Sequence, residues 1–433
     1  MLCAVIASVP VLGQNPASQG QNDLPPRRQH ADKLRKQPGN ASDRYIVVMR
    51  DDAAGPRGNS SRAHQVSNAL AATHGLQRVD RVLSRALNGF VARLSQEEAD
   101  ALSRDPRVEY VEQDVEIQAE TTQTVPGTNS NWGLDRIDQQ GLPANGQYEY
   151  DTDGSGVKAY VVDSGIRASH VEFGGRVTLG PDFVTDDPGN PTPDTSLDCF
   201  GHGTQVAGVL GGATYGVAKN VNLVAVRVLD CTGHGTSIDL ITAIDWITQD
   251  HTALPIPAVA NLSITTDAVP WSFTAIEDAI YNSIGSGVTW ILAAGNHGDV
   301  VANYSPARMQ AAITVGASYT YAGAYDMRAS FSNTGPEIDL YAPGVGITSA
   351  WGASDVSVIE CTGTSMAAPQ VAGVVARFLQ VYWWAPPGHV NNQVVLESAT
   401  VGAIWDPGPS TPNRLLYSGF LDQGARPRPA SFR

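Results

Sequence analysis

Short apolar runs that alternate with helical stretches constrain the fold of this chain more than any other feature. From residue 157 to residue 317 each run is compact and has the length of a strand, and helical patterns lie between the runs. Such alternation is typical of a parallel sheet covered by helices on both faces. The sequence therefore predicts an α/β fold, with strands at 157–162, 222–228, 259–264, 288–293 and 312–317 and helices at 236–249 and 274–284.

A small α+β domain precedes this sheet. Strand-like runs at 45–49, 89–94 and 108–115 enclose helical stretches at 63–74 and 97–103. We place this domain at residues 44–120 and the larger α/β domain at 121–420, because a polar stretch with Pro126 and Gly127 separates them. Residues 21–43 are polar without apolar periodicity and are predicted to be a disordered pro-segment, and residues 421–433 form a tail.

The first thirteen residues are apolar apart from Ser8, which predicts a signal peptide within residues 1–20 and a secreted protein. No basic residues precede this run, so an ordinary apolar N-terminus remains the alternative. No other run approaches the ~20 apolar residues that a membrane helix needs, so we expect no membrane partner. With 28 Lys and Arg against 43 Asp and Glu, the net charge is −15, which argues against a nucleic-acid partner.

Three short motifs carry polar side chains where α/β enzymes carry theirs, at the carboxyl ends of strands and the first turns of helices. Asp163 ends an apolar run, His202 lies between two glycines, and Ser365 follows a Gly turn into a helix. Each has a structural alternative, namely a turn cap, a buried structural histidine and a helix N-cap. Asn296 follows the run at 288–293 and is either a turn residue or an amide donor.

The three motifs together indicate acyl transfer. A hydroxyl nucleophile needs a neutral imidazole as its base and a buried carboxylate that fixes the imidazole tautomer. The chain order Asp163, His202, Ser365 is one of the known orders of that triad. With these motifs, the block YGVAK at 215–219 and the run VRVLDC at 226–231, residues 132–418 resemble the subtilases, and within them the proteinase K branch and its secreted aqualysin-like members. Residues 44–118, with LNGF at 87–90, resemble the family's inhibitor propeptide.

The resemblance implies a subtilisin-like fold and a secreted serine endopeptidase made as a zymogen. It assigns Ser365 as the nucleophile, His202 as the general base, Asp163 as the residue that orients His202, and Asn296 as an oxyanion donor. The implied partners are polypeptide substrates and the propeptide as an intramolecular inhibitor; we expect a monomer without a redox or nucleotide cofactor. Two alternatives are a catalytically weak peptide-binding protein of the same fold and an esterase, although residues 363–367 lack the second glycine of an esterase elbow.

The resemblance also implies where a peptide would bind. The last propeptide strand, near residues 116–120, is expected in the cleft as a product-like peptide, and self-cleavage is expected within about four residues of the Glu120–Thr121 junction. The walls of the S1 pocket, which takes the P1 side chain before the cut, and the edge strand opposite them are assigned to Ala293, Ala294, Gly295, Ser263, Ile264, Thr265, Gly233, His234 and Gly235.

Several residues depart from the family pattern. Relatives carry SLGG where this chain has SITT at 263–266, so Thr265 adds bulk to a wall that is usually glycine. With no acidic residue in the S1 segments, we expect apolar P1 side chains of modest size rather than Arg or Lys. Gln205 and Gln370 stand where relatives have histidines, which changes the hydrogen bonding around the triad.

The cysteines give no pairing by themselves, because Cys3 would leave with the signal peptide and three others remain. Aqualysin-like relatives pair the cysteines that match Cys199 and Cys231, which implies that disulfide here. Cys361 is then expected to be buried outside it, with an exposed reactive thiol as the alternative.

A structural calcium ion is also implied by the resemblance. In the proteinase K branch one carboxylate and two backbone carbonyls hold a cation, and the matching positions are Asp339 with the carbonyls of Gln310 and Ala312. Hard oxygen ligands of this kind suit Ca²⁺. The alternative is that Asp339 caps a turn.

Overall fold

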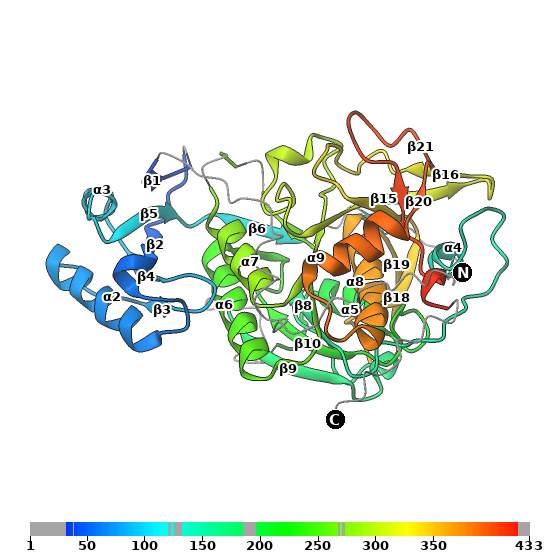
Figure 1. Cartoon of the computed structure of the whole chain (residues 1–433), viewed down its shortest axis with the longest axis horizontal. Coiled ribbons are helices and arrows are strands. Elements are labelled where there is room, and N and C mark those ends of the chain that lie inside the picture. Colours follow the sequence, from blue (N-terminus) through cyan, green and yellow to red (C-terminus); the bar gives the residue numbers. More distant parts are fainter. Residues whose placement is uncertain are drawn as a thin grey trace, which may run out of the picture.

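The computed structural model describes residues 32–37, 39–119, 123–124, 132–184, 196–266, 269–270 and 273–422. The expected signal peptide, the Glu120–Thr121 junction and the tail beyond Asp422 lie outside the described residues. A small domain, residues 32–115, lies beside a large domain, residues 132–422, and strand β6 (Glu116–Ala119) runs from the first into the second (Figure 1). In the described part of the chain, no helix has the length and apolar character needed to cross a membrane.

The small domain is an α+β domain, as the sequence predicts, and consists of a five-stranded sheet with helices on one face. The strand order is β1-β5-β2-β4-β3, in which all pairs are antiparallel except β1 with β5. Its elements are β1 (Leu34–Arg35), β2 (Arg44–Met49), α1 (Asp51–Ala54), α2 (Ser60–His74), β3 (Arg81–Leu83), β4 (Gly89–Arg93), α3 (Gln96–Ser103) and β5 (Val108–Gln113).

Within residues 21–43, the predicted disordered pro-segment, the structure describes a short strand. Leu34 and Arg35 form β1, which pairs in parallel with Val111 and Glu112 of β5. The sequence did not reveal this strand, because a two-residue strand carries no periodicity and its order depends on contacts made by Arg35 far along the chain.

The large domain is built on a mainly parallel sheet, which confirms the predicted fold class. Its main strand order is β20-β22-β17-β15-β14-β12-β8-β10-β9, and the pairs from β9 to β17 are parallel. The sheet strands are β8 (Lys158–Asp163), β9 (Val177–Asp182), β10 (Asn222–Arg227), β12 (Ala258–Leu262), β14 (Thr289–Ala293), β15 (Ile313–Tyr321), β16 (Tyr325–Arg328), β17 (Leu340–Pro343), β20 (Thr400–Val401), β21 (Ile404–Trp405) and β22 (Arg414–Leu415).

Helices cover both faces of this sheet, and the central strand shows why the strands are apolar throughout. Side chains alternate between the two faces of a strand. In β8, Ala159 and Val161 belong to the core beneath α5 (His202–Gly211) and α8 (Thr364–Val381). Tyr160 and Val162 belong to the core beneath α6 (Ser237–Ala253) and α7 (Ala275–Gly285).

The two domains share one hydrophobic core at their junction. In β2, Tyr45, Val47 and Met49 face the small domain's own helices, while Ile46 and Val48 pack into the core that contains α6 and α7 of the large domain. The sheet of the small domain is therefore buried on both faces, and burying its second face favours docking onto α6 and α7.

Candidate functional site

The candidate residues gather at one edge of the large sheet. Asp163 ends β8, which lies between β10 and β12, so the order of the strands reverses there. Ligands of open parallel sheets bind at the carboxyl ends of strands next to such a reversal. Leu262 of β12 is level with Val162 of β8 and with Leu292 of β14, so the residues that follow each strand lie side by side.

Asp163 and His202 form a buried pair. The Nδ1 atom of His202 lies 2.8 Å from Oδ1 of Asp163, and both side chains are fully buried. Oδ1 also accepts a hydrogen bond from the backbone N–H of Ser164. A carboxylate acceptor at Nδ1 requires the proton on that nitrogen, which leaves Nε2 as the basic atom of the neutral ring.

The first turn of α5 sets the position of His202. A Cβ atom on Gly203 would lie 2.1 Å from the carbonyl oxygen of Gly165, so only glycine lets α5 approach the loop after β8 this closely. The Gly203 N–H donates to Oγ of Ser164 at 2.9 Å. Gly203 therefore allows the backbone of α5 to lie against the backbone of the loop after β8.

Asp198 is a site residue that the sequence reasoning missed. Its carboxylate accepts hydrogen bonds from the N–H groups of Gly201 and Thr204 and from the hydroxyls of Ser164 and Thr204. Burial raises the pKa of this carboxyl group. An acidic residue shortly before a helix start is the usual signal of a capping residue, and that signal was present in the sequence.

Ser365 occupies the second position of α8, where the positive end of the helix dipole favours developing negative charge. Its side chain is fully buried, and its Oγ has no hydrogen-bond partner among the described residues. The backbone carbonyl of Ser365 accepts a hydrogen bond from Oγ of Ser263, the residue that follows β12, at 3.3 Å. This contact brings the start of α8 to the same sheet edge as Asp163.

The amide of Asn296 has one defined orientation. Its oxygen accepts hydrogen bonds from the backbone N–H of Thr364 at 2.9 Å and from the Thr364 hydroxyl at 3.0 Å. The same hydroxyl accepts from the N–H of Gly295, so it must donate toward Asn296. With the amide oxygen held by Thr364, the NH₂ group is directed to the other side of the amide.

Strand β6 lies between two of the segments predicted to bind peptide. It pairs antiparallel with β11 (His234–Thr236) on one side and with β13 (Ile264–Thr265) on the other. Ala119 donates to the carbonyl of Gly233 at 3.1 Å, and Gln118 is level with Thr265. A Cβ on Gly235 would lie 2.1 Å from Val228 O, so glycine is needed there.

The remaining predicted wall follows β14. Ala293 and Ala294 are fully buried, and Gly295 has a φ of +97°, a conformation that favours glycine. Asn333, which the sequence reasoning missed, donates to the carbonyl of Ala294 at 2.9 Å and accepts from the N–H of His297. These contacts hold the loop that carries Asn296.

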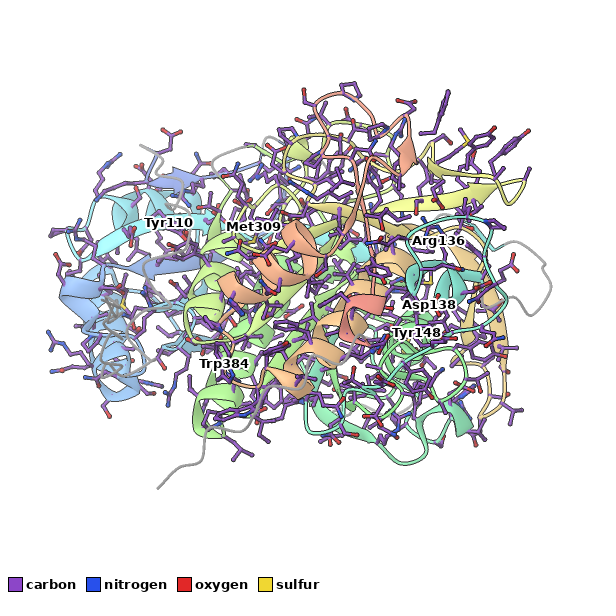
Figure 2. The ribbon with its side chains drawn as sticks, turned by 45° about the vertical axis from the view of Figure 1, so that its right-hand side comes forward. Tyr110, Arg136, Asp138, Tyr148, Met309 and Trp384 are labelled. Atoms are coloured by element: carbon purple, nitrogen blue, oxygen red, sulfur yellow. A yellow bond between two sulfur atoms is a disulfide. The ribbon has the colours of Figure 1, made fainter. Side chains whose placement is uncertain are left out.

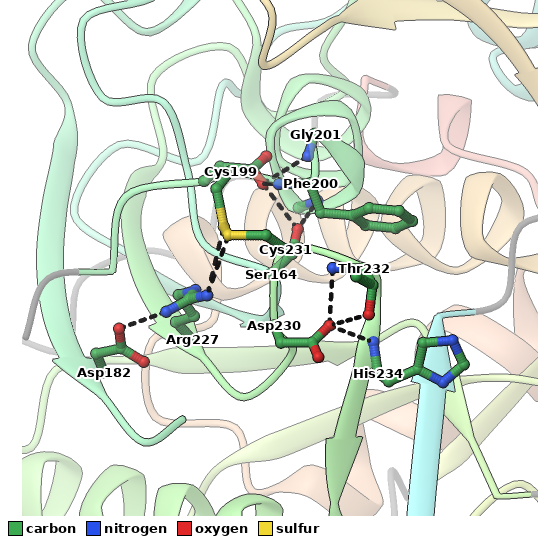
Figure 3. Close-up of a disulfide and its surroundings, with 12 residues drawn as sticks. Ser164, Asp182, Cys199, Phe200, Gly201, Arg227, Asp230, Cys231, Thr232 and His234 are labelled. Carbon is green, nitrogen blue, oxygen red and sulfur yellow. Dashed lines mark hydrogen bonds and ion pairs between the residues drawn. A yellow bond between two sulfur atoms is a disulfide. The ribbon is translucent and has the colours of Figure 1, made fainter. Parts of the chain in front are cut away.

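The predicted disulfide between Cys199 and Cys231 is confirmed, with a Cα–Cα distance of 5.0 Å (Figure 3). Cys199 lies three residues before His202 and Cys231 three residues before His234, so the bond ties the start of α5 to the strand that pairs with β6. Arg227 lies beside both sulfurs, and its guanidinium pairs with Asp182 (Figure 3). Cys361 is buried at 6% exposure and is not part of this disulfide.

The residues predicted to bind calcium lie close together in the fold. Asp339 exchanges backbone and side-chain hydrogen bonds with Thr314, the second residue of β15, and Gln310 and Ala312 immediately precede that strand. Burial raises the pKa of Asp339 to about 7, while Arg414 lowers it. Among the described residues, no group of three or more His, Cys, Asp or Glu side chains is arranged to hold a metal ion.

The two glutamines that depart from the family pattern are both buried. Gln370 donates to the carbonyl of Pro343 at 2.6 Å. Gln205, one turn after His202, is fully buried, and neither atom of its amide group has a hydrogen-bond partner among the described residues. A buried amide without partners destabilises a fold.

Comparison with known proteins gives matches over both domains. Residues 154–415 match the sequence model of the subtilase family, and residues 44–120 match that of peptidase inhibitor I9. An extracellular serine proteinase of Thermus sp. (strain Rt41A) is 44% identical over 389 residues, which covers 87% of this chain and 90% of that protein. Alkaline serine exoprotease A of Vibrio alginolyticus is 42% identical over 382 residues, which covers 87% of this chain and 67% of that protein.

Solved structures agree with these matches. A cold adapted subtilisin-like serine proteinase is 44% identical, with a TM-score of 0.60, and the match covers 67% of this chain and 99% of that chain. Fervidolysin from Fervidobacterium pennivorans, a keratinolytic enzyme related to subtilisin, is 20% identical with a TM-score of 0.70, and covers 95% of this chain and 66% of that chain. The second likeness concerns the fold alone.

Proposed function

The chain belongs to the subtilase family and is a serine endopeptidase made as a zymogen, and we propose that Ser365 is its nucleophile, His202 its general base and Asp163 the residue that orients His202. The buried 2.8 Å contact between Asp163 and His202 supports these roles. The position of Ser365 in the first turn of α8 supports them as well.

In this mechanism Ser365 Oγ attacks the scissile carbonyl carbon while His202 Nε2 takes the hydroxyl proton. His202 then gives the proton to the leaving amine, and an ester of Ser365 with the acyl half of the substrate remains. Water attacks this ester with the same proton transfers, which releases the carboxyl product and restores the hydroxyl. Asp163 stabilises the protonated His202 that forms in each half of the cycle.

Asn296 would stabilise the oxyanion of both tetrahedral intermediates. Its NH₂ group, on the other side of the amide from the oxygen held by Thr364, would be one donor, and the Ser365 N–H at the start of α8 would be a second. Fixed donors aimed at a developing negative charge need no rearrangement during the reaction, which is why they lower the barrier.

The pairing of β6 between β11 and β13 is the observation that carries this proposal furthest. A strand held on both sides in antiparallel register is bound as a peptide substrate would be. Its chain direction leads from Glu116 to Ala119 toward the junction expected to be cut. We therefore propose that Gly233, His234, Gly235, Ile264 and Thr265 bind the substrate backbone before the cut, and that Ser365 cleaves the chain itself.

Self-processing tests this proposal. When the full chain is expressed in a host lacking other secreted proteases, the wild type should lose about 120 N-terminal residues, while Ser365→Ala should stay full length, because loss of the nucleophile costs several orders of magnitude in rate. The products are measured by intact mass and N-terminal sequencing.

A matched control is Ser263→Ala, which removes a buried hydroxyl next to Ser365 but not the nucleophile. This variant should still process, although more slowly. Equal processing of wild type and Ser365→Ala would contradict the proposal. A wild type that folds but never processes would favour a peptide-binding protein of the same fold.

Secretion belongs to the same proposal. The extracellular serine proteinase of Thermus is similar over 87% of this chain, and the apolar residues at the N-terminus suit a signal peptide.

We also propose a structural calcium ion held by Asp339 and the carbonyls of Gln310 and Ala312. The donor set fits, because all three groups offer oxygen and lie directly before the neighbouring strands β15 and β17. Such an ion would neutralise the carboxylate of Asp339 and tie the segment before β15 to β17.

A further inference from the structure

We propose that residues 32–37, the clasp segment, belong to the inhibitor and hold the small domain on the large domain through Arg35. The clasp segment precedes residue 44, where the match to peptidase inhibitor I9 begins. This inference rests on the proposed role of the small domain as an intramolecular inhibitor. It adds an element that the family match does not include.

Arg35 is buried at the junction of the two domains. Its side chain is 5% exposed, although it belongs to a two-residue edge strand. The guanidinium Nη1 lies 3.3 Å from Oε2 of Glu112 in the small domain and donates to the hydroxyl of Thr274 in the large domain at 2.6 Å. One guanidinium group therefore contacts both domains.

Glu112 explains why a cation is needed at this point. Its carboxylate accepts hydrogen bonds from the N–H groups of Thr274 and Ala275 at the N-terminus of α7. Glu112 is 3% exposed, so its charge is removed from water when the domains dock. A buried carboxylate is stable only when it is paired and hydrogen-bonded, and Arg35 is the cation paired with it.

Tyr110 completes the clasp contact. The Arg35 guanidinium carbon lies 3.5 Å from the centre of the Tyr110 ring, a cation–π geometry. The Tyr110 hydroxyl donates to Asp278 of α7 at 2.7 Å. Figure 2 shows Tyr110 on the side of the small domain that faces the large domain.

The test starts from the full chain. After self-cleavage, Arg35→Met and the wild type contain the same large domain, so any difference in the release rate comes from the small domain. Each processed protein is diluted, and the appearance of peptidase activity on a small chromogenic peptide is timed. Size-exclusion chromatography shows whether the small domain leaves intact or is digested. For Arg35→Met we expect the intact small domain to dissociate about 10²-fold faster than in the wild type, because the buried Glu112 carboxylate loses its paired cation.

Lys36→Met is the matched control. It removes one positive charge from the same segment, but the Lys36 ammonium donates to Gln96 within the small domain. Its release rate should equal that of the wild type. If Arg35→Met releases its small domain within about threefold of the wild-type rate, the proposal is overturned.

A second variant covers the case in which Arg35→Met does not process. Thr274→Val removes the hydroxyl acceptor in the large domain and leaves Arg35 and Glu112 in place, so it should speed release by about tenfold. An unchanged release rate in Thr274→Val would overturn the proposed role of the clasp segment. A wild type that is fully active as soon as it is cut would overturn the inhibitor role and the clasp with it, whereas an inhibited wild type with unaffected variants would overturn the clasp alone.

Discussion

Contacts made by single residues position His202 and Asn296. Gly203 is held against Gly165, Asp198 collects the N–H groups at the start of α5, and Thr364 fixes the amide oxygen of Asn296. Each of these residues acts through a neighbour rather than on a substrate. Gly203 and Thr364 make these contacts with segments more than thirty residues away in the chain, which the motifs do not reveal, whereas Asp198 bonds to N–H groups three and six residues ahead.

Gln205 is the residue where we expect stability to be gained. Gln205→Met keeps the length of the side chain and removes an amide with no partner among the described residues. We expect the free energy of unfolding to rise by about 1–3 kcal/mol. Thermal and urea unfolding of the Ser365→Ala chain, which cannot digest itself, would measure the change. Gln370→Met should instead destabilise, because it breaks the bond to Pro343; a loss of stability in both variants would contradict the argument.

Thr265 is the residue where we expect specificity to change. It is fully buried in β13, level with Gln118 of β6, and its side chain adds bulk to the wall predicted for the S1 pocket. Thr265→Gly should raise kcat/KM for Phe and Tyr at P1 relative to Ala by at least about tenfold, because a methylene or two in such a pocket is worth ~1–3 kcal/mol. A peptide library read by mass spectrometry measures this preference, and a wild-type profile dominated by Arg or Lys would contradict the assignment of this wall.

At the scale of elements, strands buried on both faces determine the assembly. The run from Tyr45 to Met49 is apolar at every position because the side chains of β2 pack into two cores. One face of the strand packs into the core of its own domain, and the other packs into the core shared with α6 and α7. The N-termini of these two helices are also capped from the small domain. Asp114 accepts from Ile238 at the start of α6, and Glu112 accepts from Thr274 and Ala275 at the start of α7.

These caps make docking depend on pH. Burial raises the pKa of Glu112 from 4.5 to about 7, although Arg35 and the helix N–H groups lower it. Because the pKa is higher in the docked state, the protonated form favours docking. This contribution is fully present below about pH 4.5 and is lost as the pH rises through about 7. Burial also raises the pKa of Asp114, while Arg44 lowers it. Tyr110, Asp278 and Asp239 are further ionisable groups at the junction.

We therefore expect the processed protein to release its small domain faster at about pH 9 than at about pH 6. Samples held at each pH are returned to one common pH before the activity is read, so that the pH dependence of catalysis does not enter. Glu112→Gln should weaken this pH dependence. Slower release at the higher pH would contradict the assignment.

At the scale of the whole molecule, the disulfide joins segments that the sheet leaves separate, and the proposed calcium ion would reinforce two neighbouring strands. The disulfide ties the start of α5 to β11, and the ion would tie residues 310–312 to Asp339. Both reduce the freedom of loops next to the sheet edge that carries the site. The shared core beneath α6 and α7 makes the small domain part of the folded precursor rather than an appendage.

Removal of calcium tests the ion. A chelator should lower the melting temperature of the wild-type large domain, and Asp339→Asn should lower it without a chelator and reduce the further effect of one. Glu337→Gln, two residues away, is the matched control and should keep the wild-type response. Equal chelator sensitivity in wild type and Asp339→Asn would show that another site matters.

The amino-acid sequence by itself determined the layers and the chemistry of this protein. Apolar runs such as 157–162 and 45–49 predicted buried strands because burial on two faces leaves no polar alternation, and Asp163, His202 and Ser365 stood in a recognisable order. The strand at Arg35, the contact of Gly203 with Gly165 and the contact of Asn333 with Ala294 were decided only by the tertiary structure. These features depend on partners far away in the chain, and a local sequence pattern does not indicate which distant groups come into contact.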